Sequence, residues 1–216
     1  MTYEHDLRTK IIVTARKMNI VGINHGTSGN VSARMPSLPK DFFITPSAIP
    51  YDDLLPDMIA RMNVNGAKIS GGTPSTEWAL HRAIYKTRQD VMAIVHSHPI
   101  HCMALACAHV EIPAFHYMVA VAGGGKIPLA KYATFGTEEL AYNTVEALGN
   151  TYSACLMANH GLVAVGKSLD AALHLAEEVE TLARTFILAK LLDPKILSPE
   201  EIARVLEKFR SYNSAR

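Results

Sequence analysis

Two histidines stand where a strand is predicted to end, at positions suited to binding a metal ion. Residues 91–95 form a short apolar run rich in β-branched side chains, which predicts a strand buried on both faces. Because residues i and i+2 of a strand point to the same side, His96 and His98 are expected to project together into a cleft. Two neutral imidazoles on one face supply half of a typical zinc site. A pair of hydrogen-bonded histidines in a loop would fit the same spacing.

A third histidine is expected at the tip of a hairpin. The apolar runs 154–158 and 162–165 are typical of two buried strands, and the sequence Asn-His-Gly joins them. This places His160 in the turn, beside a glycine whose φ is unrestricted. Catalytic zinc sites usually take three protein ligands and leave one position open for water or substrate. His96, His98 and His160 match that number.

Glu77 is a candidate for a carboxylate at the same site. Residues 73–76 are typical of a capped helix start, and a helix is expected from residue 77 to about residue 88. An acidic residue in the first turn also has a simpler explanation, because negative charge is favoured at the N-terminal end of a helix. His81 lies one turn further along the same helix face and is the weaker ligand candidate.

Two segments have features of an anion site. Residues 24–30 contain two glycines, which let backbone N–H groups approach an anion closely. Residues 73–76 bring hydroxyls and free N–H groups to a helix N-terminus. Spacing alone favours a plainer interpretation of the first segment, a tight turn into a strand.

The rest of the chain alternates helices with strands. Helices are expected at residues 7–18, 77–88, 100–108, 137–148, 169–192 and 199–208. Strands are expected at residues 31–35, 42–44, 58–64, 67–70, 91–95, 154–158 and 162–165. Residues 120–125 are expected to form a loop of small side chains. Because hairpins are frequent, we expect an α/β (α+β) fold, a three-layer sandwich whose mixed, mostly antiparallel sheet has helices on both faces.

Composition narrows the class of protein. A chain of 216 residues with 49% hydrophobic and 19% charged residues is expected to form one domain, 1–216. A net charge of +1 gives no reason to expect binding to nucleic acid or to a membrane surface. The three cysteines show no Cys-x-x-Cys spacing, which favours a reducing, cytoplasmic location. The N-terminus shows no signal peptide, and no apolar run approaches the roughly 20 residues that span a bilayer.

Seven short motifs, in order along the chain, resemble the class II aldolase family and, within it, the L-fuculose-1-phosphate aldolases. They are Gly-Thr-Ser-Gly-Asn at 26–30, Ile-Thr-Pro-Ser-Ala-Ile-Pro-Tyr at 44–51, Pro-Ser-Thr-Glu-Trp at 74–78, Val-His-Ser-His at 95–98, Ile-Pro-Ala-Phe-His-Tyr at 112–117, Tyr-Ala-Thr-Phe-Gly at 132–136 and Asn-His-Gly at 159–161. The similarity covers nearly the whole chain, including residues 205–212. It implies a class II aldolase/adducin-type domain and a fourfold-symmetric homotetramer with sites between subunits.

The resemblance also implies roles for individual residues. The implied metal ligands are His96, His98 and His160, with Glu77 as an acid/base that can also bind the metal when the site is empty. Tyr117 matches a second catalytic residue, which acts from a neighbouring subunit. The implied phosphate-binding residues are Gly29, Asn30, Ser47, Ala48, Ser75 and Thr76. Ser47 and Ala48 stand where the fuculose enzymes usually have Thr-Gly, so this loop is expected to differ. The residues implied near the sugar tail are Phe135 and Tyr212.

The implied chemistry is reversible cleavage of a ketose 1-phosphate to dihydroxyacetone phosphate and an aldehyde. Cleavage leaves an enediolate, and a divalent metal ion would stabilise its negative charge without a lysine Schiff base. Tyr117 would take the proton of the C4 hydroxyl, and Glu77 would protonate the enediolate carbon. Zn²⁺ is the expected ion, although three imidazoles and a carboxylate also accept Co²⁺ or Mn²⁺.

Other members of this family keep the metal chemistry but act differently. A 5-deoxyribulose or 5-methylthioribulose 1-phosphate aldolase, in salvage of nucleoside by-products such as methionine salvage, is the strongest alternative to the fuculose substrate. A ribulose-phosphate 4-epimerase, a dehydratase and a non-catalytic family member are weaker ones. A non-catalytic member would be expected to lose metal ligands, and all three histidines are present.

Overall fold

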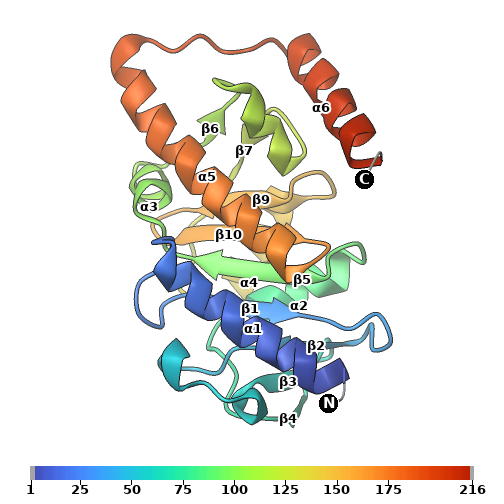
Figure 1. Cartoon of the computed structure of the whole chain (residues 1–216). Coiled ribbons are helices and arrows are strands. Elements are labelled where there is room, and N and C mark those ends of the chain that lie inside the picture. The colour runs from blue at the N-terminus through green and yellow to red at the C-terminus, as the bar shows by residue number, and fades with distance from the viewer. Residues whose placement is uncertain (1–2, 215–216) are drawn as a thin grey trace.

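A central sheet between two layers of helices forms the body of the protein (Figure 1). This computed structural model describes residues 3–214. One face of the sheet carries α1 (Tyr3–Ile20), α3 (Ile100–Cys107) and α5 (Leu169–Ala189). The opposite face carries α2 (Trp78–Thr87) and α4 (Glu138–Leu148). The last helix, α6 (Pro199–Ser214), lies across the molecule from the C-terminal half of α5, to which a loop connects it (Figure 1).

The sheet has eight strands in the order β4-β3-β2-β1-β5-β10-β9-β8. Its strands are β1 (Asn30–Ala33), β2 (Asp41–Ile44), β3 (Ala60–Asn63), β4 (Lys68–Ser70), β5 (Ala93–Ser97), β8 (Leu129–Ala130), β9 (Ala154–Met157) and β10 (Gly161–Gly166). All neighbouring pairs are antiparallel except β8 and β9, which are parallel. Two further strands, β6 (Ile112–Pro113) and β7 (Lys126–Ile127), form a separate antiparallel pair.

Strand alternation builds a separate hydrophobic core on each face of the sheet. In β2, Phe43 belongs to the core under α1 and α5, whereas Phe42 and Ile44 belong to the core under α2 and α4. The central strand β5 alternates in the same way, with Val95 on the first face and Ile94 on the second. Both faces of β5 are therefore buried, and functional side chains can reach solvent only where the strand ends.

Helix α6 has a small core of its own. It packs against the 3-10 helix η3 (Tyr117–Ala122) through a cluster of buried apolar side chains. The cluster consists of Ala114, Ala120, Ile202 and Val205. The remaining short helices are η1 (Tyr51–Asp53), η2 (Pro56–Met58) and η4 (Lys190–Leu192).

The structure confirms the expected fold class and most of the expected elements. Several expected bounds were wrong in detail. The central strand, expected at 91–95, covers Ala93–Ser97, so His96 lies within it, next to the end. The small-residue loop expected at 120–125 is in part the helix η3, because a 3-10 turn satisfies its backbone groups. The last helix continues to residue 214 instead of ending near 208. Helix α2 begins at Trp78, with Glu77 as an N-cap residue that makes no side-chain cap hydrogen bond.

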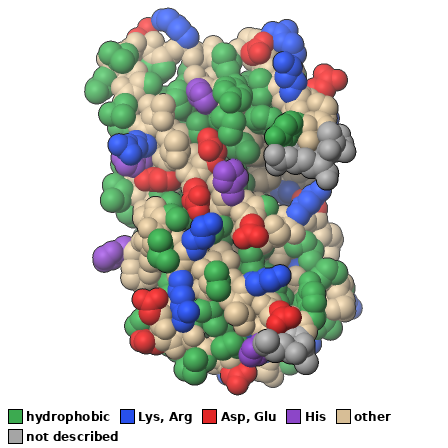
Figure 2. All heavy atoms as spheres, in the orientation of Figure 1, with side chains coloured by type: hydrophobic (Ala, Val, Ile, Leu, Met, Phe, Trp, Pro, Cys, Tyr) green, Lys and Arg blue, Asp and Glu red, His purple; other side chains and the backbone are tan. Residues whose placement is uncertain are grey.

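Surface charge and helix hydropathy agree with the balanced composition. On the face seen in Figure 2, acidic and basic side chains are interspersed instead of being grouped by sign. Within residues 3–214, no helix combines the length and the apolar character needed to cross a membrane.

Candidate metal centre and active site

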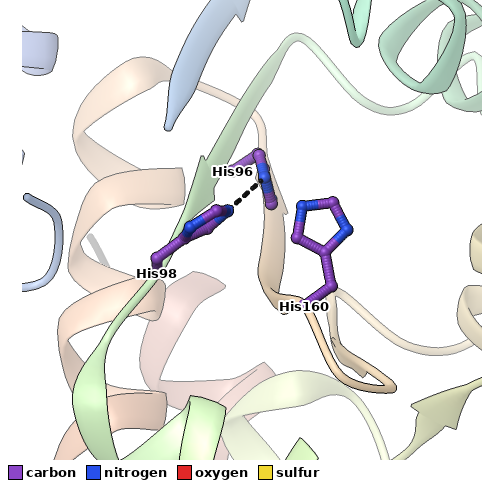
Figure 3. Close-up of side chains that lie close together, drawn as sticks. All are labelled: His96, His98 and His160. Atoms are coloured by element: carbon purple, nitrogen blue, oxygen red, sulfur yellow. Dashed lines mark hydrogen bonds between the residues drawn. The ribbon is translucent and has the colours of Figure 1, made fainter. Parts of the chain in front are cut away.

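The three candidate histidines converge at one end of the central strands. Figure 3 shows the imidazoles of His96, His98 and His160 pointing toward one another. Their ring centroids are 4.9 to 5.0 Å apart, and one ring nitrogen of each lies within 4.8 Å of the corresponding nitrogens of the other two. Such a cluster of neutral imidazoles can bind a divalent metal ion from three sides.

His96 and His98 are placed by the end of β5 and the start of α3. His96 is fully buried, and its Nδ1 lies 3.0 Å from the carbonyl oxygen of Leu162 on β10. A carbonyl can only accept, so Nδ1 carries a hydrogen and Nε2 is the nitrogen that can bind a metal. Immediately after His98, the carboxylate of Glu180 on α5 accepts from the backbone N–H groups of His101 and Cys102 at 3.0 and 2.9 Å. This contact caps the free end of α3 and fixes the strand-to-helix turn.

His160 is placed by the hairpin tip between β9 and β10. Asn159 adopts a left-handed conformation with φ +52°, which asparagine tolerates better than most residues. Its backbone N–H donates to the carbonyl of Ala106 on α3 at 3.2 Å. Its side-chain oxygen accepts from Nε2 of His109 at 2.6 Å. Contacts from the neighbouring helix thus hold the turn that presents His160.

The carboxylate of Glu77, at the start of α2, lies against the histidine cluster. Its Oε2 lies 3.0 Å from Nε2 of His96, and its Oε1 lies 3.3 Å from Nε2 of His160. Burial alone would raise the pKa of Glu77, but the charge and hydrogen bond of His96, then the charge of His160 and the hydrogen bond from Asn30, lower it well below its usual range. The carboxylate is therefore ionised and carries a buried negative charge into the histidine cluster.

The donor set fits a divalent metal ion. Oε1 of Glu77 is buried and has no hydrogen-bond partner among the described residues, so it is free to bind a cation. Burial, followed by the charge of His96, lowers the pKa of His98 to about 3 and that of His160 to about 4. Both imidazoles are thus neutral at physiological pH, as metal ligands must be. Burial lowers the pKa of His96, but the charge and hydrogen bond of Glu77, then the hydrogen bond to Leu162, raise it overall, so a metal ion bound at Nε2 would displace a proton from this residue. The geometry and the buried negative charge of Glu77 agree with a metal site.

His81 lies behind this cluster and is not a ligand. It is fully buried, and its ring nitrogens contact Ser32 at 2.6 Å and the side-chain oxygen of Asn30. Asn30 in turn donates to Oε2 of Glu77 at 3.0 Å. Asn30 is paired directly with His96 across β1 and β5, so both side chains face α2.

His81 is expected to make the stability of the metal-free protein depend on pH. Burial, followed by the charge of His96, lowers its pKa to about 3, whereas an unfolded histidine has a pKa of about 6.5. Below pH 6.5 the unfolded chain therefore binds a proton that the folded protein excludes, and stability falls. Between pH 7 and 5.5, we expect the free energy of unfolding to fall by about 1.3 kcal/mol more in the wild type than in His81→Gln. Urea titrations with a chelator would test this, and equal changes in both proteins would contradict it.

The histidine cluster borders a cleft of about 560 Å³, which His98 and His160 line. The lining residues expected from the sequence are Ser47, Ala48, Thr76, Glu77, His98, Phe135 and His160. Gly29, Asn30 and Ser75 are buried just behind it. The hydroxyl of Tyr51 donates to the carbonyl of Gly29, and the N–H of Ser47 donates to the carbonyl of Thr73 at 3.0 Å. These contacts bring the three loops of the predicted phosphate site to one wall.

Ala48 has a strained backbone in this wall. Its φ is +59°, in the left-handed region that favours glycine, and its methyl group is exposed. We therefore expect Ala48→Gly to raise the free energy of unfolding by about 0.5–1 kcal/mol, because relief of strain exceeds the added entropy of the unfolded glycine. Urea denaturation measures this effect. The matched control is Ala203→Gly at an exposed position in α6, where a loss of about 1 kcal/mol is expected; a loss at both positions would contradict the prediction.

Close packing next to the histidine cluster requires a glycine at position 161. A Cβ at this position would lie 2.6 Å from the carbonyl oxygen of Ser97 and 2.9 Å from Cδ2 of His98. We expect Gly161→Ala to lower stability by about 1–3 kcal/mol and metal affinity by about tenfold or more, because the ring of His98 must move. Isothermal titration with Zn²⁺ measures the second effect. Gly125→Ala is the control, since the atom nearest to a Cβ there would be Cγ2 of Ile202 at 3.8 Å. Equal metal affinity in the two variants would refute the argument.

Two residues implied by the family resemblance lie away from this cleft. Tyr117 starts η3, is 49% exposed and faces Phe209 of α6 with ring centroids 6.5 Å apart. Tyr212 on α6 is 60% exposed. Within one chain, neither side chain lines the cleft that contains Glu77. The third implied residue of the substrate tail, Phe135, does line it and is 66% exposed.

Sequence reasoning missed several residues of the site. Thr27, Ser28 and Tyr132 line the cleft, although only the motifs that contain them had been noted. Glu180 and His109 support the turns that carry the ligands. The spacing of Glu77, His81 and Tyr85 by four residues was a usable signal for a shared helix face, but their partners on β1 are remote in sequence.

Comparison with known proteins shows which family of proteins the chain is similar to. The family model described as "Class II Aldolase and Adducin N-terminal domain" matches residues 9–187. The chain is 46% identical over 208 residues to the L-fuculose phosphate aldolase of Escherichia coli K12, covering 95% of each. It is 43% identical to the 5-methylthioribulose-1-phosphate/5-deoxyribulose-1-phosphate aldolase of Rhodospirillum rubrum, covering 95% of this chain and 92% of that one. A solved L-fuculose 1-phosphate aldolase superposes with a TM-score of 0.91 at 38% identity, covering 95% and 96%.

These matches, with the three-layer fold and the histidine cluster, show that the chain belongs to the class II aldolase family. It is an enzyme of the aldehyde-lyase type. Members of this family depend on a metal ion, and the cluster of His96, His98 and His160 is where this chain can hold one.

Proposed function

We propose that this enzyme reversibly cleaves a ketose 1-phosphate of the L-fuculose 1-phosphate type to dihydroxyacetone phosphate and an aldehyde. The observation that carries the proposal is the ionised carboxylate of Glu77, held 3.0 and 3.3 Å from two of three convergent imidazoles at a cleft. A carboxylate in that position can exchange a proton with a substrate carbon that the same site activates. The 46% identity to an L-fuculose phosphate aldolase supports the substrate class.

His96, His98 and His160 would hold the metal, which we propose to be Zn²⁺ with Co²⁺ or Mn²⁺ as substitutes, and Glu77 would be a fourth ligand before substrate binds. The bound ion would polarise the ketose carbonyl and stabilise the negative charge that develops on its oxygens. Glu77 would donate a proton to C3 after the aldehyde leaves and remove it in the condensation direction.

The phosphate of the substrate would bind at the wall formed by the three loops. Thr76 and Ser47 offer hydroxyls in the cleft, and Gly29, Asn30, Ala48 and Ser75 shape the backbone around them. A Cβ at Gly29 would lie 2.6 Å from both Oδ1 of Asn24 and the carbonyl of His96, so only glycine lets this loop pack against them at the wall of the cleft. No cluster of lysines is needed, because N–H groups and hydroxyls suffice for an anion.

We also propose that the enzyme works as a homotetramer with its sites between subunits. The exposure of Tyr117 and Tyr212, away from the cleft of their own chain, supports this arrangement. Tyr117 of a neighbouring copy would take the proton of the C4 hydroxyl, and Tyr212 would contact the aldehyde portion beside Phe135. The cytoplasm is the proposed location, since the three cysteines form no disulfide.

A second substrate is favoured by a specific observation. The relative from Rhodospirillum rubrum, named for 5-methylthioribulose 1-phosphate and 5-deoxyribulose 1-phosphate, is nearly as similar as the fuculose enzyme. The exposed ring of Phe135 in the cleft would suit an apolar aldehyde. We therefore keep both substrate classes in the test.

The test is to assay metal-reconstituted enzyme with a panel of substrates and to measure the release of dihydroxyacetone phosphate from each. The panel contains L-fuculose 1-phosphate, L-rhamnulose 1-phosphate, 5-deoxyribulose 1-phosphate and 5-methylthioribulose 1-phosphate. The proposal expects the highest kcat/KM for fuculose 1-phosphate. A tenfold preference for the 5-deoxy-pentose phosphates, about 1.4 kcal/mol of discrimination, would assign the second substrate class instead. If the enzyme cleaved none of the four substrates, the aldolase proposal would be refuted, and an epimerase or a dehydratase would be favoured.

A further inference from the structure

A hydrogen-bonded series of buried polar side chains runs from Glu77 into the interior of the protein, through Asn30, His81, Ser32 and Tyr85. We call this series the relay. Helix α2 and the residue before it carry Glu77, His81 and Tyr85 at intervals of four, and β1 carries Asn30 and Ser32 at an interval of two. These spacings put each set on one face of its element, and the two faces meet. All five residues are between 0% and 5% exposed. None of the four behind Glu77 lines the cleft.

The donor and acceptor at every link follow from the carboxylate at one end. Ionised Glu77 only accepts, so the amide nitrogen of Asn30 donates to Oε2 at 3.0 Å. The amide oxygen of Asn30 must then accept from Nε2 of His81. A neutral imidazole has its hydrogen on one nitrogen only, so Nδ1 accepts from the hydroxyl of Ser32 at 2.6 Å. Ser32, having used its hydrogen, accepts from the hydroxyl of Tyr85 at 2.9 Å.

From this order we infer that Tyr85, Ser32 and His81 are positioning residues that fix the amide of Asn30 and thereby the carboxylate of Glu77. Oε2 is occupied by Asn30 and His96. Oε1, which makes no hydrogen bond within residues 3–214 and lies 3.3 Å from Nε2 of His160, is the atom that exchanges a proton with substrate. The inference rests on the proposed aldolase function. If the amide of Asn30 turned over, its oxygen would face Oε2 and repel it.

An ordinary structural role would not need this arrangement. Asn30, Ser32, His81 and Tyr85 are buried beside an apolar core, and apolar residues of similar size would fill that space at lower cost. A fully satisfied network in such surroundings fixes one geometry, because each broken link leaves a buried group without a partner. The benefit of that rigidity falls on Glu77, the only member of the relay that reaches the cleft.

The step that the relay serves can be followed apart from bond cleavage. With dihydroxyacetone phosphate alone, the C3–H bond breaks, its electron pair stays on the ketose, and the proton passes to Oε1 of Glu77. Exchange of that proton with D₂O and its return to C3 place deuterium in the product. No oxidant or further reactant is required, and the aldehyde plays no part.

The test compares four variants of the metal-loaded enzyme in cleavage, in deuterium exchange and in Zn²⁺ titration. His81→Leu removes both ring hydrogen bonds, whereas His81→Gln can still donate to Asn30 and accept from Ser32. Tyr85→Phe removes only the hydroxyl at the far end. Thr144→Val is the matched control, because Thr144 is fully buried on α4 and its hydroxyl donates to the carbonyl of Leu140 in the same helix at 2.8 Å.

For His81→Leu we expect kcat and the exchange rate to fall together by about 10- to 100-fold, with KM and Zn²⁺ stoichiometry unchanged. His81→Gln should recover at least part of this loss, Tyr85→Phe should show a smaller loss of the same kind, and Thr144→Val should match the wild type. Equal losses in His81→Leu and Thr144→Val, or a loss in KM alone, would overturn the relay. So would a Gln variant no better than the Leu variant.

A spectroscopic readout separates failure of the relay from failure of the proposed function. Long-range ¹H–¹⁵N spectra of the imidazole rings report which nitrogen of His81 carries hydrogen, whether or not the enzyme is active. The relay requires hydrogen on Nε2, and hydrogen on Nδ1 would overturn it. If the wild type neither cleaves the panel nor exchanges deuterium, the aldolase proposal fails, and the assignment of Oε1 fails with it.

Discussion

Replacing His96 with alanine is expected to abolish tight metal binding and to lower kcat by roughly 10³-fold or more. His96 is the fully buried member of the cluster, and its imidazole contacts His98 at 3.1 Å and Glu77 at 3.0 Å. Two partly exposed imidazoles would remain, which are too few to hold the ion at its working position. Metal analysis of the purified variant and initial rates with the best panel substrate measure the two effects.

Removal of the metal from the wild type should reproduce this result reversibly. Dialysis against a chelator is expected to abolish activity, and Zn²⁺, Co²⁺ or Mn²⁺ should restore it in the wild type but not in His96→Ala. His174→Ala is the control, since His174 is an exposed residue on α5. A His96→Ala enzyme that keeps one metal ion per chain and wild-type activity would show that the cluster is not the metal site.

Replacing Glu77 with glutamine is expected to lower kcat by about 10²- to 10⁴-fold while metal remains bound. The amide has nearly the shape of the carboxylate but cannot accept and return a proton at physiological pH. The three histidines stay in place, so the variant should still bind Zn²⁺, although more weakly because the negative charge is lost. The loss should be equally large in deuterium exchange at C3 of dihydroxyacetone phosphate.

The control for this variant is Glu146→Gln, at an exposed position on α4. It should match the wild type in every assay. If Glu77→Gln lost only metal affinity and regained full kcat at saturating Zn²⁺, Glu77 would be a ligand alone and the proton would have to pass through another group.

The sequence was sufficient for features that depend on local periodicity. The β-branched run before His96 predicted a strand, and the structure confirms it as β5. The neighbouring strands expected at 58–64 and 67–70 are confirmed as the antiparallel pair β3 and β4. His160 was expected at a hairpin tip and lies between β9 and β10. Each of these features is fixed by a few neighbouring residues, through side-chain alternation or turn geometry.

The family resemblance named the ligands, but only the tertiary structure brought them together. Their convergence depends on β5 lying between β1 and β10, which is decided by long-range strand pairing. The same pairing sets Asn30 opposite His96 and so turns a predicted phosphate contact into a partner of Glu77 and His81. Its role toward phosphate stays a prediction.

The supporting contacts were beyond sequence reasoning for the same physical reason. Glu180 caps α3 from 79 residues away in the chain, and Ser32 meets His81 across 49. Local patterns determine which face of an element is apolar and where it ends. Packing alone decides which buried polar groups share a face, and those pairings set the protonation and orientation of Glu77.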